Sequence, residues 1–295
     1  MQPQGPWIVG LDLDSRSRGA LVFAAWLQRV GQVPLVGVHM LEAWVRALAA
    51  EDPVPALRTA AMLQATAVGI PAFDRLQVRT VEDTSEGLVE SCAAASGLVI
   101  GRAAERGSRA VVRLGRVARR VLRRLPCPVV VVPPDLSAVA DGPILLATDL
   151  GPASLTAARF AAELAVRCGH TLELVHVVDD RSVHRIDVLQ SAWAARRAAS
   201  VAAAEAAMAR WSGERLLGAA TRHVRTGNPV DVIVETAAAR RAALIVVGSR
   251  RLSAAMRYFS TSTASDLAAA ATCPVCVVPP VERDERRGGS VDVEV

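Results

Sequence analysis

Two residue types recur where the apolar runs of this sequence end, and their positions suit the binding of an anionic ligand. Asp12 follows the run IVGL, and Asp149 follows ILLAT. Gly101 and Gly248 close two later runs, LVI and IVV, directly before loops that lead into helical stretches. Ligands of parallel sheets bind beyond the carboxyl ends of the strands. A glycine there lets the backbone approach a phosphate, and the free N–H groups of the next helix can hold the anion.

These residues belong to an internal repeat, which is the first feature to establish in any sequence. Four blocks match in the same order along the chain. They are residues 8–21 with 144–158, 34–40 with 172–178, 96–101 with 243–248, and 125–134 with 272–280. Asp12 and Asp149 lie 137 residues apart, whereas Gly101 and Gly248 lie 147 apart, a step that one loop insertion explains. The chain is therefore a tandem duplication of one domain.

Each copy alternates strand-like apolar runs with long alanine-rich stretches of helical period. In the second copy the pattern predicts strands at 143–149, 171–178, 216–225, 243–248 and 274–279, and helices at 153–168, 184–211, 229–241 and 262–271. Near-continuous apolar strands such as LIVVG indicate burial on both faces, which is typical of parallel sheets covered by helices. We therefore predict an α/β fold with two doubly wound domains, each built on a parallel five-stranded sheet.

The domain boundaries follow from the repeat. We place the first domain at 1–138 and the second at 139–282, with a short linker in DLSAVADG (135–142) and a flexible tail at 283–295.

On these motifs the sequence resembles the universal stress protein family, twice and over nearly the whole chain. The resemblance rests on an Asp after strand one, His-Met or His-Val in strand two, V-x-G after strand four, and the ending PCPVVVVPP. It implies that the last strands, PVVVVPP and PVCVVPP, pair across the two copies to form an internal pseudo-dimer. It also implies adenine nucleotide, ATP, as the ligand, and leaves a further homodimer open.

Family members that bind ATP carry G-x2-G-x9-G-[ST] after strand four, and both copies depart from this pattern. The first copy has no glycine three residues after Gly101, and its final pair, Gly115-Arg116, lies one residue too far away. In the second copy Arg251 and Thr261 replace the second and third glycines, while Ser262 keeps the hydroxyl.

The resemblance implies specific binding residues in each copy. On the adenine and ribose side they are Asp12 and Met40 in the first copy and Asp149 and Val177 in the second. On the phosphate side they are Gly101, Gly115 and Arg116 in the first copy and Gly248, Thr261, Ser262 and Thr263 in the second. A plainer interpretation competes, because an Asp at a strand end often only caps the next turn, and TSTAS could be a helix cap. We predict that the second copy is the weaker site.

Other conspicuous residues favour structural roles. His39 and His176 have no nucleophile pattern nearby and read as satisfied core histidines. Five arginines, at positions 116, 119, 120, 123 and 124, share one side of an amphipathic helix and read as a solvated face. Cys273 and Cys276 form a C-x-x-C in an apolar strand without a second ligand pair, so we expect neither metal nor disulfide there.

Composition narrows the class of protein. The chain of 295 residues has 52% hydrophobic residues, but no apolar run approaches the ~20 residues that span a bilayer. The N-terminus, MQPQGPW, lacks the pattern of a secretory signal, so we expect a cytoplasmic protein with no membrane contact. A net charge of +5 would tolerate nucleic acid, but only 3% aromatic residues argue against it as a partner.

The sequence thus predicts a stress-response binding module that binds ATP without catalysis, with no catalytic residue and no metal. Two alternatives stay open. One is a slow ATP hydrolase or other nucleotide-using enzyme of related fold, against which stands the lack of a clear base, nucleophile or carboxylate cluster near the glycine loop. The other is a partner-binding protein whose nucleotide pockets have decayed.

Overall fold

The structure is a computed structural model. It describes residues 5–14, 17–70, 73, 75–102, 104–106, 112–151, 153–179, 190–213, 217, 219–249 and 263–280.

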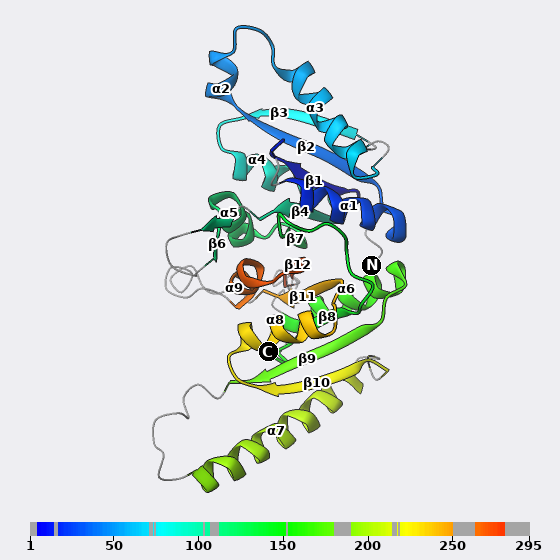
Figure 1. Ribbon diagram of the computed structural model, residues 1–295, viewed down its shortest axis with the longest axis vertical. Coiled ribbons are helices and arrows are strands. Elements are labelled where there is room, and N and C mark those ends of the chain that lie inside the picture. The colour runs from blue at the N-terminus through cyan, green and yellow to red at the C-terminus, as the bar shows by residue number, and fades with distance from the viewer. Residues whose placement is uncertain are drawn as a thin grey trace, which may run out of the picture.

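The first half of the chain runs from β1 to β7 (Figure 1). Its strands are β1 (Trp7–Leu11), β2 (Leu35–Glu42), β3 (Arg75–Val81), β4 (Gly97–Gly101), β5 (Ala104–Arg106), β6 (Val112–Leu114) and β7 (Val129–Val132). Its helices are α1 (Arg18–Gly31), α2 (Ala43–Leu48), α3 (Val54–Ala67), α4 (Thr84–Ser91) and α5 (Arg116–Arg124).

The second half runs from β8 to β12. Its strands are β8 (Ile144–Ala147), β9 (Leu172–Val178), β10 (Thr221–Thr226), β11 (Leu244–Gly248) and β12 (Val275–Val278). Its helices are α6 (Ala153–Cys168), α7 (Gln190–Gly213), α8 (Pro229–Ala239) and α9 (Thr263–Ala270).

The described strands, apart from the β5–β6 hairpin, form one ten-stranded sheet in the order β10-β9-β8-β11-β12-β7-β4-β1-β2-β3. Each half contributes a parallel five-stranded sheet, as predicted, and the order of the strands is the same in both halves. The two sheets do not stand apart: β12 pairs antiparallel with β7, so they join edge to edge (Figure 1). This pairing confirms the pseudo-dimer, and it covers an edge strand of each half that would otherwise expose unpaired backbone groups.

The strand registers confirm the duplication residue by residue. Gly10 pairs with Val38 in the first half, and the matching Ala147 pairs with Val175 in the second. The backbone repeats as well, because Leu13 and Leu150 both adopt a left-handed conformation, with φ of 62° and 61°. That conformation is uncommon for leucine, so the turn after the first strand is the same in both copies.

The predicted elements of the second copy differ from the structure mainly at their ends. Helix 153–168 matches α6, and most other bounds shift by one or two residues, as expected where ends fray. The prediction of a strand from residue 216 is wrong, since β10 begins at Thr221 and residues 219–220 form a turn and bend. The start predicted for the helix at 184–189 and the tail at 283–295 lie outside the described residues.

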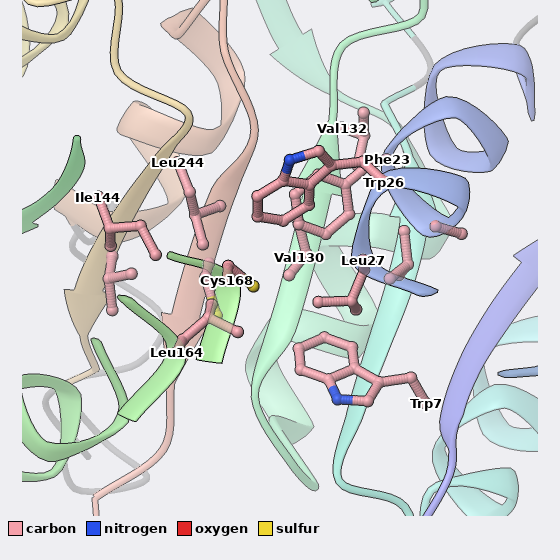
Figure 2. Close-up of a cluster of buried hydrophobic side chains, with 14 of the residues drawn as sticks. Trp7, Phe23, Trp26, Leu27, Val130, Val132, Ile144, Leu164, Cys168 and Leu244 are labelled. Atoms are coloured by element: carbon pink, nitrogen blue, oxygen red, sulfur yellow. The ribbon is translucent and has the colours of Figure 1, made fainter. Parts of the chain in front are cut away.

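The hydrophobic core occupies both faces of the sheet and continues across the junction of the halves. Val130 and Cys276 point to one face, while Val131 and Val275 point to the other. On the first face α1 packs beside α6, and Trp26 meets His170 with ring centroids 5.5 Å apart. Figure 2 shows side chains from both halves gathered in this one cluster. Each fully buried Val, Leu, Ile, Phe or Met side chain in these clusters stabilises the fold by roughly 1.5–3 kcal/mol relative to an exposed one.

Candidate functional site

A cavity of about 550 Å³ opens in the first half at the carboxyl ends of β1, β2 and β4. The order of strands reverses between β1 and β4, and open parallel sheets bind ligands at such a point. All five residues predicted for the first copy line this cavity: Asp12, Met40, Gly101, Gly115 and Arg116. They come from four separate parts of the chain, so the fold brings them together.

The carboxylate of Asp12 is held by the turn that follows β1. Its Oδ1 accepts hydrogen bonds from the Asp14 N–H, at 3.2 Å, and from the Ser17 hydroxyl. The backbone N–H of Asp12 in turn donates to the Ser17 Oγ at 2.9 Å. The plainer capping interpretation therefore holds, yet Asp12 also borders the cavity and is exposed. These hydrogen bonds fix the orientation of the Asp12 carboxylate, which borders the cavity.

His39 is the satisfied histidine that the sequence predicted. Its Nδ1 lies 2.8 Å from the Leu11 carbonyl oxygen, and His176 Nδ1 lies 2.8 Å from the matching Thr148 oxygen. Because a carbonyl only accepts, both rings carry their proton on Nδ1. His39 also lines the cavity, which the sequence interpretation did not assign.

The beginning of α5 also lines the cavity. Gly115 occupies the N-cap position, and no side chain in the described part of the chain caps this helix. The first backbone N–H groups of α5 consequently lack a side-chain acceptor. Arg116, which is exposed, adds a positive charge at the same place. Such a helix start favours an anion.

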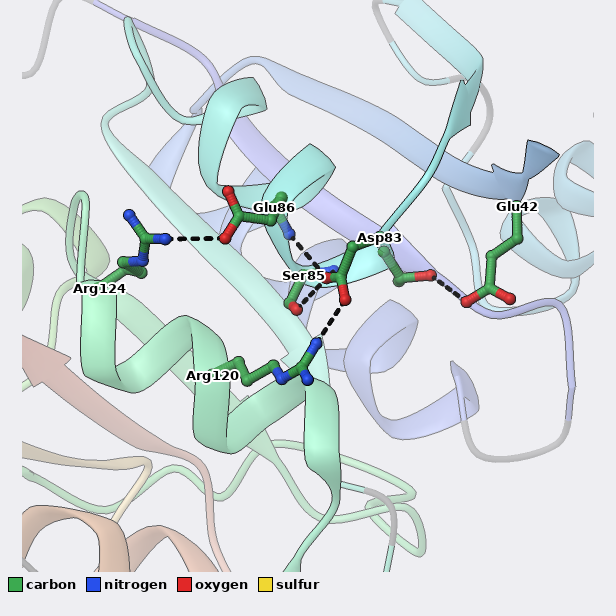
Figure 3. A network of polar contacts seen from close by, with 7 residues as sticks. Glu42, Asp83, Ser85, Glu86, Arg120 and Arg124 are labelled. Carbon is green, nitrogen blue, oxygen red and sulfur yellow. Dashed lines mark hydrogen bonds and ion pairs between the residues drawn. The ribbon is translucent and has the colours of Figure 1, made fainter. Parts of the chain in front are cut away.

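Two ion pairs connect α5 to α4, another helix that borders the cavity (Figure 3). Arg120 pairs with Asp83, and Arg124 pairs with Glu86 at 2.8 Å. The arginine face is exposed, as predicted, but the sequence did not reveal that two of its members join neighbouring helices. These pairs align Thr84 and Leu88 on α4 with Arg116 on α5 around the cavity.

Asp83 has a second role as the N-cap of α4. It accepts hydrogen bonds from the Ser85 N–H at 2.8 Å and the Glu86 N–H at 3.2 Å, as well as from the Ser85 hydroxyl. The hydrogen bond from the Ser85 side chain, followed by the backbone hydrogen bonds and the charge of Arg120, lowers the pKa of Asp83 to about 2. Asp83 therefore stays ionised at neutral pH.

Three further polar residues of the cavity escaped the sequence interpretation: Ser17, Glu42 and Thr84. Thr84 Oγ1 donates to Glu42 Oε1 at 3.2 Å, which ties α4 to the end of β2. The regular spacing of a glycine motif could not indicate them, because they lie outside the glycine loop. The only local signal was their place after a strand or at the start of a helix.

In the second half, the described candidates lie at the corresponding edge of the sheet. Asp149 Oδ1 accepts from the Gly151 N–H at 2.9 Å and the Ser154 Oγ at 2.7 Å, which reproduces the turn at Asp12. Val177 lies in β9, Gly248 ends β11, and Thr263 begins α9. Thr261, Ser262 and Arg251 lie outside the described residues, so the relative strength of the two sites stays a prediction.

Two findings concern metals and membranes. Among the described residues no group of three or more His, Cys, Asp or Glu side chains could hold a metal ion. Cys276 lies in β12 and packs on one face of the sheet, whereas Cys273 precedes the strand and packs on the other. Within the same residues, every helix is too short or too polar to cross a bilayer.

Comparison with known proteins supplies the family. A model described as the universal stress protein family matches residues 7–133 and 142–279. A universal stress protein from Archaeoglobus fulgidus DSM 4304 is 18% identical, with a TM-score of 0.65, and the match covers 94% of this chain and all (100%) of that one. A functionally unknown protein from Pseudomonas aeruginosa PAO1 is 17% identical, with the same TM-score of 0.65 and 94% of each chain covered.

At these identities the solved structures show likeness of fold alone. No curated protein matches the chain by sequence. The family model, in contrast, covers both halves and all ten described strands of the sheet. The chain therefore belongs to the universal stress protein family, as a protein with two such domains in tandem.

Proposed function

We propose that the first-half cavity binds an adenine nucleotide and that the protein works as a stress-response binding module, not as a catalyst. One observation carries the proposal: the five residues that the sequence assigned to nucleotide binding line a single cavity at the switch point of the sheet. Its volume of about 550 Å³ lies within the range of roughly 300–1,000 Å³ that is usual for small-molecule sites.

The lining offers a suitable surface for each part of a nucleotide. Val38, Met40 and Leu88 provide an apolar wall for the base. Asp12 provides a carboxylate that can accept hydrogen bonds from ribose hydroxyl groups. The start of α5 and the charge of Arg116 can hold phosphate.

Binding without rapid turnover is the reading that the chemistry of the lining favours. Asp12 is engaged by Ser17 and the following turn, and His39 directs its Nδ1 proton to a backbone carbonyl. Glu42 accepts from Thr84 and from the Trp44 indole. Each of these titratable groups is thus oriented by a structural contact. Among the described residues, no cluster of three or more His, Cys, Asp or Glu side chains could hold the metal ion that phosphoryl transfer commonly uses.

Calorimetric titration of the purified full chain with ATP, ADP and AMP tests the proposal. We expect binding at the first-half cavity, and a loss of at least about tenfold in affinity for Arg116→Ala, since a charge-assisted contact contributes more than 1.4 kcal/mol. Arg119→Ala is the matched control, because Arg119 lies one turn away on α5, is exposed and does not line the cavity.

Equal affinity for Arg116→Ala and Arg119→Ala, or no binding of any adenine nucleotide, would refute this assignment. A turnover assay on the same protein separates the module from a slow hydrolase. Phosphate release faster than the background of Arg116→Ala would favour the enzyme.

A further inference from the structure

Arg102 is the described residue that most directly links the first-half cavity to the other half of the molecule. It follows Gly101, a cavity-lining residue, and its side chain is only 8% exposed. Its Nη1 donates to three carbonyl oxygens of the second half, those of Ala268 at 3.3 Å, Ala269 at 2.6 Å and Ala271 at 2.8 Å. These carbonyls form the C-terminal end of α9.

This contact has a clear physical basis. The last carbonyls of a helix have no partner within the helix, and they carry the negative end of its dipole. A buried guanidinium supplies both the donors and the positive charge that this end requires. The contact therefore stabilises the end of α9 and, in return, fixes the chain directly after Gly101.

The start of α5, which also lines the cavity, packs against α9 through the residue before it. Leu114 precedes Gly115, the N-cap of α5, and is 4% exposed. It belongs to the same buried cluster as Ala264 and Leu267 of α9. The backbones of β6 and α9 are in contact, and Figure 1 shows the two elements as neighbours. Gly101 and Gly115 of the cavity lining are thus each adjacent in sequence to a residue that packs against α9.

At the equivalent position of the second half, the described residues show no reciprocal arrangement. The backbone N–H of Arg102 donates to the backbone carbonyl oxygen of Val132 at 2.7 Å. In the same way, the backbone N–H of Ser249 donates to that of Val278 at 2.9 Å. These equivalent hydrogen bonds identify Ser249 as the counterpart of Arg102 in the repeat. A serine side chain is too short to reach across the junction as Arg102 does, so at this repeat position only the first half contacts the other half through its side chain.

We propose that Arg102 is a positioning residue for the first-half cavity, which keeps its shape only while Arg102 and Leu114 hold it against α9 of the second half. The two domains are then not independent binding modules, because a helix of one forms the support for the pocket of the other. The inference rests on the proposed function of the cavity, but the support itself is measurable without any ligand.

Hydrogen–deuterium exchange of the full chain, read by mass spectrometry, measures that support. In Arg102→Met, which keeps the apolar stem and removes the guanidinium, we expect amides of residues 114–118 and 267–271 to exchange about tenfold faster. Amides of β1 and β2 should keep their wild-type rates. Arg102→Lys, which retains a charged donor, should recover most of the protection. Arg119→Met is the control and should change neither segment.

Two results would overturn the proposal: unchanged exchange at 114–118 in Arg102→Met, or a uniform increase over the whole chain that signals general destabilisation. If Arg102→Met does not fold, Ala270→Gly weakens the exposed end of α9 and should accelerate exchange at 114–118 in the same way. Unchanged rates there would refute the support by α9.

Titration of the same variants with ATP separates this inference from the proposed function. Where the wild type binds ATP, Arg102→Met should weaken binding about tenfold and Arg102→Lys far less. Equal affinity in Arg102→Met would contradict the positioning role. Absence of binding in the wild type would refute the nucleotide proposal, while the exchange data would still decide the role of Arg102.

Discussion

The carboxylate of Glu173 in β9 lies against the guanidinium of Arg240, which donates from Nε at 2.9 Å and from Nη2 at 2.5 Å. His223 of β10 approaches the same carboxylate with Nε2 at 2.7 Å. Glu173 is only 3% exposed, and the matching register position in the first half is Val36. A buried carboxylate is tolerated only when it is paired and hydrogen-bonded, so this cluster distinguishes the second half.

The cluster of Glu173, Arg240 and His223 predicts that the free energy of unfolding depends on pH. Burial alone raises the pKa of Glu173, but the hydrogen bonds from Arg240 and His223 outweigh it and lower the pKa below its ordinary value. A carboxyl with a depressed folded pKa stabilises the fold above its unfolded pKa of about 4.3, and this contribution is lost as the pH falls through the folded pKa. Glu173→Gln should therefore cost about 1–3 kcal/mol at pH 7, with a smaller difference below about pH 4.

Urea unfolding of wild type and Glu173→Gln at several pH values checks this. Glu205→Gln is the control, since Glu205 is exposed on α7. The lower pH should be about 3.5, which is below the unfolded pKa of about 4.3. If Glu173→Gln lowers the free energy of unfolding equally at about pH 7 and about pH 3.5, the charge of Glu173 does not stabilise the fold.

A second prediction concerns the cap of α4. Asp83→Ala removes the acceptor for two backbone N–H groups and should cost about 1 kcal/mol in the free energy of unfolding. Asp83→Asn keeps a capping oxygen and loses only the ion pair with Arg120, so it should cost about 0.5 kcal/mol or less. Because the pKa of Asp83 is depressed to about 2, its ionic contribution persists above its ordinary value of 3.8 and fades toward pH 2. Thermal unfolding of the two variants would rank their losses of stability. If Asp83→Asn destabilises the protein as much as Asp83→Ala, the ion pair with Arg120 and not the helix cap provides the stabilisation.

The two halves should differ as ligand sites, and we expect the first to be the stronger. Asp12→Ala should abolish most ATP binding in a calorimetric titration, whereas Asp149→Ala should leave it nearly unchanged. The reason lies in the sequence of the loops: Arg251 and Thr261 replace motif glycines in the second copy, and side chains there hinder the approach of phosphate to the backbone. The opposite pattern of losses would reverse the assignment.

The thiols of the C-x-x-C should be inert at neutral pH. Burial raises the pKa of Cys273 to about 11 and raises that of Cys276 above its ordinary range. The thiolate is the reactive form, so neither residue should react with iodoacetamide at pH 7 in the folded protein within the time that unfolded protein reacts fully. Elemental analysis should detect no stoichiometric zinc. Zinc at one equivalent, or a disulfide between Cys273 and Cys276 in a peptide map, would show that the apolar interpretation is wrong.

Much of the fold could be predicted from local patterns in the sequence. The apolar runs near 8–11 and 144–147 predicted buried parallel strands, and the four repeated blocks in the same order predicted two equivalent domains. Both signals are visible without tertiary structure, because strand burial and helix period are written in neighbouring residues. The predicted start of the strand that became β10 was wrong, because the apolar residues 219–220 form a turn and bend before the strand begins at Thr221.

The amino-acid sequence by itself determined the duplication and a five-stranded parallel sheet in each half, because repeats and buried strands are local features. The resemblance to a known family implied the five candidate residues Asp12, Met40, Gly101, Gly115 and Arg116. The family resemblance implied the pairing of β7 with β12, which the structure confirms. Only the tertiary structure decided that Arg102 reaches α9 and that Glu173 meets Arg240. The partners in these contacts are 67 to 167 residues apart for the side chains named. Such contacts leave no periodic trace in the sequence, and they form only when packing brings distant segments together in a low-dielectric interior, where charged groups must find partners.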